Sequence, residues 1–278
     1  MLVLVHIGDH FPSYINECIE KVNSVSDTPI HVLLDRKHIP LLRGRVTPFP
    51  LDGIHMDELH ARFESMSILN DYMRGGLWKF ATKRFFYLYT HMKQQGLTDV
   101  FHIENDILIY MDFTEKLSLF QQKDMWCVLD SEERCIPSFV YIKNETILEK
   151  LLHTCIECSS KGLNDMQALA KFAQQNSTVG CLPIITNYCS PLSEKFYQHA
   201  EAFGCLFDGA CVGQYIGGVD PRNNPGDTRG FINETTVFQC DKVTIEWREG
   251  KPWLNSLPLM NLHIHSKDLA RWMNITYK

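Results

Sequence analysis

Two carboxylates, one residue apart, follow an apolar run in the middle of the chain. Glu104-Asn105-Asp106 stands between the apolar runs VFHI and ILIY. About four such acid pairs are expected by chance in a chain of this composition, so the setting is more informative than the spacing. Carboxylates at the carboxyl end of a strand in an α/β sheet lie where ligands bind, and their oxygens suit divalent cations. The triplet predicts a place where a divalent cation and a diphosphate meet; the alternative is a solvated turn.

A second polar group lies near the end of the sequence, in the apolar stretch LPLMNLHIHSK. On a strand, Asn261, His263 and His265 would share one face because side chains alternate. A buried polar cluster needs partners that offset its desolvation, and a cation bridging a diphosphate is a suitable partner. The competing interpretation is a pair of core histidines that are hydrogen-bonded to protein groups.

The elements that must position these residues alternate between strands and helices in the first half of the chain. Strands are expected over Leu2–Ile7, Ile30–Leu34, Val46–Phe49 and Val100–Glu104, and helices over Pro12–Ser24 and His55–Gln95 with a break at Gly75-Gly76. This alternation predicts a mostly parallel sheet flanked by helices. Ligands bind outside the carboxyl ends of such strands, so His6, Gly8 and Asp35 are candidate donor-binding residues, together with Glu104 and Asn105.

The second half continues in the same manner. Strands are expected over Met125–Leu129, Ser138–Ile142, Cys181–Ile185, Val243–Trp247 and residues 257–265, and helices over Glu145–Ser160, from Asn164 and from Lys267. The glycine-rich segment Gly204–Glu234 does not suit regular structure and is expected to be a lid over the donor. No linker or repeat divides the chain, so a single domain is expected.

The order of these features resembles the glycosyltransferases of the GT-A fold, which use nucleotide-diphosphosugar donors. Glu104-Asn105-Asp106 stands where that family has an Asp-x-Asp motif that holds Mn²⁺ or Mg²⁺ against the donor diphosphate. A first strand at the start of the sequence, the helix LWKFATKRFFYLYTHM and the late strand MNLHIHSK extend the resemblance over nearly the whole chain. Glu104 in place of the first Asp is a departure, which keeps an oxygen ligand but lengthens its reach by one methylene.

The resemblance implies roles for further residues. In the glycogenin-like branch of the fold, a late histidine and a lysine a few residues on complete the metal site, as His263 or His265 and Lys267 would do here. Imidazole favours Mn²⁺ over Mg²⁺. The fold often supplies a basic contact to the donor before the motif, for which Lys83 and Arg84 are the candidates. Their alternative is a solvated helix face.

Two carboxylates compete for the role of the catalytic acid or base. Asp165 begins an expected helix where related transferases place an acidic residue that faces the sugar or acceptor. It could take up the proton of the acceptor hydroxyl, or it could simply interact with the helix dipole. Asp208 is the rival, because it lies at the start of the glycine-rich segment.

The composition excludes several classes of protein. The 278 residues are 22% charged and 45% hydrophobic, which is typical of a globular protein with a sizeable core. The net charge is -6 and no run of Lys/Arg exceeds two residues, so nucleic acid is not an expected partner. No apolar stretch reaches the roughly 20 residues of a membrane span, and the first residues are expected to form a strand, not a signal peptide.

Cysteine usage bears on the compartment. Ten cysteines lie mostly in apolar runs, which favours buried thiols in a reducing cytoplasm. Cys155-x-x-Cys158 has no second ligand pair and does not predict a zinc site. Four sequons, at Asn144, Asn176, Asn233 and Asn274, exceed the roughly one and a half expected by chance and keep a lumenal origin open.

Together these features predict one α/β domain of the GT-A type over residues 1–278, with a nucleotide-sugar-binding half at 1–110 and an acceptor-binding half at 111–278. The expected activity is Mn²⁺- or Mg²⁺-dependent transfer of a sugar from a nucleotide-sugar, in particular a UDP-sugar, to a hydroxyl of a glycan or other acceptor. One alternative is a sugar-phosphate nucleotidyltransferase, against which His6–His10 argues because it has one glycine and no Lys/Arg. The other is a non-catalytic nucleotide-sugar-binding protein.

Overall fold

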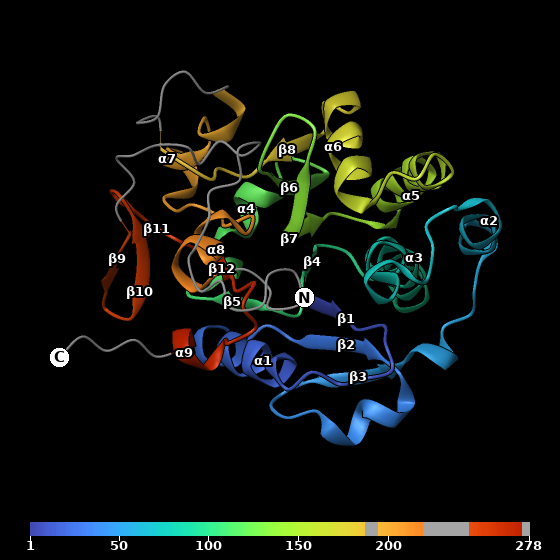
Figure 1. The fold of residues 1–278 in the computed structure, drawn as a ribbon. Helices are drawn as coiled ribbons and strands as arrows, with labels where there is room; N and C mark the ends of the chain where they lie inside the picture. Colours follow the sequence, from blue (N-terminus) through green and yellow to red (C-terminus); the bar gives the residue numbers. More distant parts are fainter. Residues whose placement is uncertain (187–193, 219–244, 274–278) are drawn as a thin grey trace.

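A seven-stranded sheet forms the centre of the protein (Figure 1). The structure is a computed structural model that describes residues 1–186, 194–218 and 245–273. The strands are β1 Leu2–Val5, β2 Ile30–Leu34, β3 Thr47–Pro50, β4 Val100–Ile103, β6 Met125–Leu129, β7 Cys135–Ile142 and β8 Val179–Cys181. Their order is β3-β2-β1-β4-β7-β6-β8, and β7 runs antiparallel to both of its neighbours whereas the other neighbouring pairs are parallel. The predicted α/β class with a mostly parallel sheet is therefore confirmed.

Helices cover both faces of this sheet. The longer ones are α1 Tyr14–Val25, α2 Glu58–Met66, α3 Leu77–Gln95, α5 Glu145–Ser159 and α6 Asp165–Gln175, and the shorter ones are α4 Leu117–Phe120, α7 Ala200–Phe203, α8 Cys211–Gly217 and α9 Ala270–Met273. In Figure 1, α3, α5 and α6 lie together on one side, and α1 lies with α9 on the other. Short 3-10 helices occur at Arg36–Leu41, Leu51–Gly53, Met73–Gly76, Phe113–Lys116 and Glu194–Phe196.

The ends of two helices are encoded locally. Asn164 precedes α6, and its side chain accepts a hydrogen bond from the backbone N–H of Gln167 while the Gln167 side chain accepts one from the Asn164 N–H, which forms a capping box. Helix α3 lies between Gly76 and Gly96, whose φ angles of 78° and 61° are in the left-handed region that glycine tolerates. These caps fix where α3 and α6 begin, and both helices supply residues to the site described below.

Two small sheets are separate from the central one. Strands β9 Ile245–Arg248, β10 Lys251–Leu254 and β11 Leu257–Pro258 form an antiparallel group. Strand β12 Asn261–His263 pairs antiparallel with β5 Ile107–Ile109, and His263 lies opposite Ile107. The late strand therefore returns to the residues that follow β4.

The boundaries of several elements differ from those expected. The strand expected over Cys181–Ile185 is wrong, because β8 ends at Cys181 and Pro183 has no N–H with which to continue a ladder. The strand expected over residues 257–265 is split into β11 and β12. The last helix begins at Ala270 instead of Lys267, since Lys267 has a φ of 64°, outside the helical range.

The expected lid falls largely outside the described residues. Of the segment Gly204–Glu234, residues 219–234 are not described by the structure. The described part contains α8, so the expectation that the segment avoids regular structure is wrong there.

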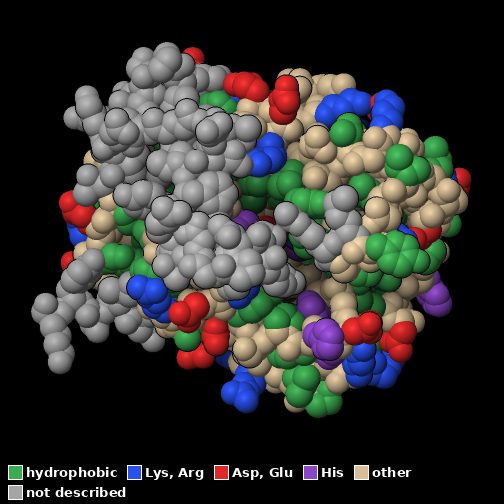
Figure 2. Space-filling model, viewed as in Figure 1, with side chains coloured by type: hydrophobic (Ala, Val, Ile, Leu, Met, Phe, Trp, Pro, Cys, Tyr) green, Lys and Arg blue, Asp and Glu red, His purple; other side chains and the backbone are tan. Residues whose placement is uncertain are grey.

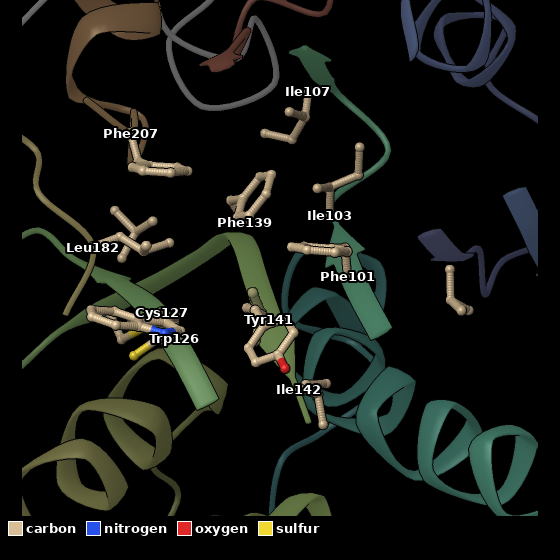
Figure 3. Packing of buried hydrophobic residues seen from close by; sticks show 14 of the residues in the cluster. Phe101, Ile103, Ile107, Trp126, Cys127, Phe139, Tyr141, Ile142, Leu182 and Phe207 are labelled. Carbon is tan, nitrogen blue, oxygen red and sulfur yellow. The ribbon is translucent and has the colours of Figure 1, made fainter. Parts of the chain in front are cut away.

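Aromatic side chains from neighbouring strands pack together in the core (Figure 3). The ring centroids of Phe101 and Phe139 are 5.8 Å apart, and those of Phe139 and Phe207 are 5.1 Å apart. Ile103 and Ile107, which flank the Glu104–Asp106 turn, are fully buried. Because each buried side chain of this size contributes about 1.5–3 kcal/mol, the core holds the turn at both ends.

Other expectations concern thiols, membranes and surface charge. The eight cysteines in the described residues form no disulfide bond, and burial raises the pKa of the Cys155 thiol. Within the described ranges, no helix combines the length and apolar character needed to cross a bilayer. On the face in Figure 2, the basic side chains are scattered among acidic ones.

Three buried histidines should make the free energy of unfolding depend on pH. Burial lowers the pKa of His60 and His91 from 6.5 to about 4, and that of His102 to about 3. Between these values and pH 6.5 the unfolded chain binds more protons than the folded chain, so the free energy of unfolding falls as the pH falls. We expect a loss of about 1–2 kcal/mol per ring between pH 7 and pH 5, measured by urea unfolding.

The variant His60→Leu tests this directly. Neither ring nitrogen of His60 has a hydrogen-bond partner in the described structure, so an apolar replacement removes the titrating group without breaking a bond. Its stability should depend less on pH below 6.5 than that of the wild type. His10→Leu, at an exposed position, is the control. Equal pH dependence in His60→Leu and wild type would contradict the assignment.

Candidate active site

The acid pair lies in the turn between β4 and β5, at the carboxyl end of β4. Asp106 is 6% exposed, and the Glu104 side chain is 19% exposed. Asn105 anchors the turn, because its Nδ2 donates a hydrogen bond to the carbonyl of Val5 at the end of β1 (3.1 Å). The Asn105 Oδ1 is buried and has no partner in the described structure, which leaves an oxygen for a ligand.

The β5–β12 pairing brings His263 to this turn. Its Nε2 lies 3.1 Å from Asp106 Oδ2 and 3.5 Å from Glu104 Oε2. The Ile264 N–H also donates to the Asp106 carbonyl (3.0 Å). One ligand atom from each of Glu104, Asp106 and His263 lies within 4.8 Å of the other two, so the three residues can hold one cation.

The structure separates the two histidines that the sequence left equivalent. His265 accepts a hydrogen bond at Nδ1 from Gln214 Nε2 of α8 (3.1 Å), and its ring lies edge-on to that of His263 with centroids 4.4 Å apart. Burial, aided by the charges of His263 and Lys267, lowers the pKa of His265 to about 3. His263 is therefore the candidate ligand, and His265 packs behind it.

Two cations contact the acid pair. Lys267 Nζ donates a hydrogen bond to Asp106 Oδ2. Arg84, buried on α3, donates to Glu104 Oε1 (2.6 Å) and to Asp165 Oδ2 (2.9 Å). Arg84 therefore joins the motif to the first residue of α6.

Lys83, the other basic candidate, lies elsewhere. Its Nζ is 2.5 Å from Glu64 Oε1 of α2, and Lys79 also contacts Glu64, at 3.3 Å. Consecutive residues of a helix point in different directions, so Arg84 faces the sheet while Lys83 faces α2. Arg84 lies next to Phe85 and one helical turn before Leu88, and both of these residues are buried. This position on the helix could have distinguished Arg84 from Lys83 in the sequence.

Charge balance sets the ionisation of these groups. Burial alone would raise the pKa of Asp106, but His263 and Lys267 outweigh it and hold the pKa well below its usual value. Burial alone would lower the pKa of His263, but the negative charges of Asp106 and Glu104 outweigh burial and raise this pKa. Burial raises the pKa of Asp165 to about 6 in spite of Arg84. Burial would also raise the pKa of Glu104, but Arg84 and His263 outweigh burial and lower this pKa. The acid pair is thus ionised at neutral pH, and Asp165 is poised to exchange a proton there.

Asp208 has a different environment. Its carboxylate accepts hydrogen bonds from the backbone N–H groups of Val212, Gly213 and His263, at 2.8–2.9 Å. It is 1% exposed. Since both oxygens accept backbone bonds, the geometry favours Asp165 over Asp208 as the acid–base candidate.

The remaining predicted residues lie at the carboxyl ends of β1 and β2. His6 Nε2 donates to the His10 carbonyl (2.8 Å), and His38 Nε2 donates to the Gly8 carbonyl (3.1 Å). The rings of His6, Phe11 and His38 form a group with centroids 5.7–6.2 Å apart, in which His6 and Phe11 are half-buried and His38 is buried. Asp35, half-buried, follows β2. Phe11 and His38 did not emerge from the sequence, although Phe11 follows closely on the strand end.

This edge of the sheet is therefore lined by two groups. One is the cluster of rings that follows β1 and β2. The other is the charged cluster at β4, β12 and α6. In Figure 2, histidine and acidic side chains are visible in the hollow near the centre of the face.

Comparison with known proteins bears on the fold. No protein-family model and no curated protein matches the sequence. Among solved structures, apo mouse xyloside xylosyltransferase 1 superposes with a TM-score of 0.50 at 7% identity, covering 73% of this chain and 91% of that one. PaToxG glycosyltransferase has a TM-score of 0.44 at 11% identity (63% and 68% covered), and the galactosyltransferase LgtC has 0.42 at 11% (66% and 73% covered). The chain has the GT-A fold, as its sequence predicted.

Proposed function

We propose that the protein is a glycosyltransferase that moves a sugar from a nucleotide-sugar, a UDP-sugar in particular, to a hydroxyl of a glycan or other acceptor, with Mn²⁺ or Mg²⁺ as cofactor. The observation that carries the proposal is the convergence of Glu104, Asp106 and His263 at the carboxyl end of β4. The GT-A fold supports it, because this edge of an α/β sheet is where ligands bind.

The residues present fit a divalent cation. Two carboxylates and one imidazole make a mixed oxygen and nitrogen donor set, which favours Mn²⁺ over Mg²⁺. His263 Nδ1 and Asn105 Oδ1 are buried without a partner in the described structure, as expected of a site built for a ligand. When bound, the cation would neutralise the negative charge on the departing diphosphate.

The other charged residues then have distinct roles. Lys267 places an ammonium beside Asp106, where it can contact diphosphate oxygens. Arg84 orients Glu104 and Asp165 at once, since a guanidinium forms two directed bonds. Asp165 Oδ1 has no partner in the described structure, so this carboxylate can bind the sugar or accept the acceptor's proton. Asp208, whose two oxygens already accept backbone hydrogen bonds, is the weaker candidate for the base.

We assign donor binding to the first part of the chain, residues 1–110, and acceptor binding to 111–278, which also supplies His263. His6, Gly8 and Asp35 are proposed to hold the nucleoside, with the half-buried ring of Phe11 available for stacking on the base. Donor binding by Lys83 would require its ion pair with Glu64 to open. The buried thiols favour a reducing, cytoplasmic location.

A nucleotidyltransferase is not favoured by this geometry. The loop after β1 carries His6, Asp9 and His10 but no Lys or Arg, so it lacks the basic groups that would bind the phosphates of an incoming nucleoside triphosphate. A non-catalytic binding protein has the same pocket and is distinguished by turnover.

A nucleotide-sugar panel tests the proposal. We expect the unfolding temperature to rise when a UDP-sugar and Mn²⁺ are added together, because a ligand at 100 times its Kd adds about 2.7 kcal/mol of stability. Slow Mn²⁺-dependent hydrolysis of the same donor should follow, measured as release of the nucleoside diphosphate. Controls replace Mn²⁺ with EDTA, or the nucleotide-sugar with free sugar.

Each result has a defined meaning. Stabilisation without hydrolysis or transfer would identify the non-catalytic binding protein. No stabilisation by any nucleotide-sugar in the presence of Mn²⁺ would contradict the proposed donor class.

A further inference from the structure

The backbone of His263 is held on two sides by residues far from it in sequence. Its N–H donates to Asp208 Oδ2 (2.9 Å). Its carbonyl oxygen faces Gly213 of α8, so closely that a Cβ built on Gly213 would lie 1.8 Å from that oxygen. Helix α8 therefore packs with its backbone directly against β12 at the residue that supplies the imidazole.

Asp208 is itself fixed by two further elements. The Asn261 side chain of β12 accepts from the Asp208 N–H (3.2 Å) and donates to the Asp208 carbonyl (3.0 Å). Ser138 of β7 donates to the same carbonyl through Oγ (2.8 Å). Asp208 is therefore tied to the central sheet, to β12 and to α8.

The chemistry of these contacts requires a carboxylate. Oδ1 accepts from the Val212 N–H, and Oδ2 accepts from the N–H groups of both Gly213 and His263. An amide has only one accepting oxygen, so Asn at this position would turn an NH₂ group toward an N–H donor in either orientation. The three backbone N–H groups partly offset the desolvation of this buried carboxylate.

We propose that Asp208 is a positioning residue for the cation site. Its carboxylate sets the backbone of His263 so that Nε2 reaches Asp106 and Glu104, and it links that position to the first turn of α8. The inference rests on the proposed role of His263 as a cation ligand. It gives Asp208 a role in the site without contact with substrate, in place of the acid–base role.

A purely structural carboxylate would behave differently from a positioning one. Loss of a structural carboxylate lowers the free energy of unfolding but leaves Mn²⁺ affinity unchanged in the fraction that is folded. Loss of a positioning residue lowers Mn²⁺ affinity through His263, typically by about 10–100-fold. The two interpretations are therefore distinguished by metal binding, without any measurement of transfer.

The experiment is a double-mutant cycle on Mn²⁺ affinity, measured by electron paramagnetic resonance titration of the purified protein. The variants are Asp208→Asn, His263→Ala and the double variant. We expect each single variant to bind Mn²⁺ about 10–100-fold more weakly. In the His263→Ala background, Asp208→Asn should have almost no further effect, since the imidazole it positions is gone.

Asp130→Asn is the matched control. Asp130 is also a buried carboxylate, 2% exposed, but its partner is the side chain of Arg134. The Asp130→Asn variant should have a lower unfolding temperature than the wild type and the same Mn²⁺ affinity.

Failure of the inference and failure of the proposed function give different results. If His263→Ala binds Mn²⁺ as wild type does, the proposed cation site is wrong. If His263→Ala weakens binding but Asp208→Asn does not, or if Asp208→Asn acts equally in both backgrounds, Asp208 does not position His263. Should Asp208→Asn fail to fold, Asp208→Glu takes its place in the cycle, because it keeps the negative charge and displaces the carboxylate by one methylene.

Discussion

Replacing Asp106 with Asn is expected to reduce sugar transfer by at least about 10³-fold while the protein remains folded. The substitution keeps the size of the side chain and removes the negative charge that faces His263 and Lys267. A neutral amide attracts a divalent cation far less strongly than a carboxylate does. The measurement is single-turnover transfer at saturating Mn²⁺, with circular dichroism as the check on folding.

Asp112→Asn is the matched control for this variant. Asp112 lies six residues further along, and its Oδ1 accepts a hydrogen bond from the Thr114 N–H at the start of a 3-10 turn. It should transfer sugar at the wild-type rate. A rate near wild type in Asp106→Asn, with Mn²⁺ still required, would mean that the cation is held elsewhere.

Replacing Arg84 with Met should affect both stability and activity strongly. Glu104 and Asp165 would lose the buried guanidinium that joins them, and two carboxylates would be left without a counter-charge on that side. Breaking a buried pair in this way typically costs about 3–5 kcal/mol. We expect a loss of this order in urea unfolding, and about 10²–10³-fold in the transfer rate because Asp165 and Glu104 lose their common orientation.

Two further variants make the Arg84 prediction specific. Lys83→Met, one residue away, removes a cation that pairs with Glu64 and should have a much smaller effect on transfer. Arg84→Met combined with Asp165→Asn should recover part of the lost stability, since it removes one of the two uncompensated charges. If Arg84→Met and Lys83→Met reduce transfer equally, the bridge to Glu104 has no role in the reaction.

Residues with a strong local signal were predicted well. Apolar runs that end in polar residues located β1, β2 and β4, and because parallel strands share an edge, His6, Asp35 and Glu104 were expected at one edge of the sheet. A helix was expected to begin at Asn164, and the side chain of this residue caps α6 by binding backbone N–H groups in a capping box.

Features that depend on tertiary contacts could not be predicted from the sequence. Strand periodicity placed His263 and His265 on one face, but β12 ends at His263, and only its partner β5 decides which imidazole meets Asp106. Likewise, the identity of the groups around Asp208 depends on the packing of α8 on β12. The four-residue error at the end of β8 arose because hydrophobicity continues beyond Cys181, whereas hydrogen bonding does not continue through Pro183.

The β5–β12 pairing also has a consequence for biosynthesis. Asp106 and His263 are 157 positions apart, so translation delivers the carboxylates long before the imidazole. A nascent chain can form β1, β2 and β4 early, since domains fold as their amino-terminal parts emerge, but joining such distant segments is slow and occurs late. The proposed cation site therefore cannot guide the early steps of folding. It is complete only when β12 has been made and has docked, so we expect Mn²⁺ affinity to report on the completion of folding.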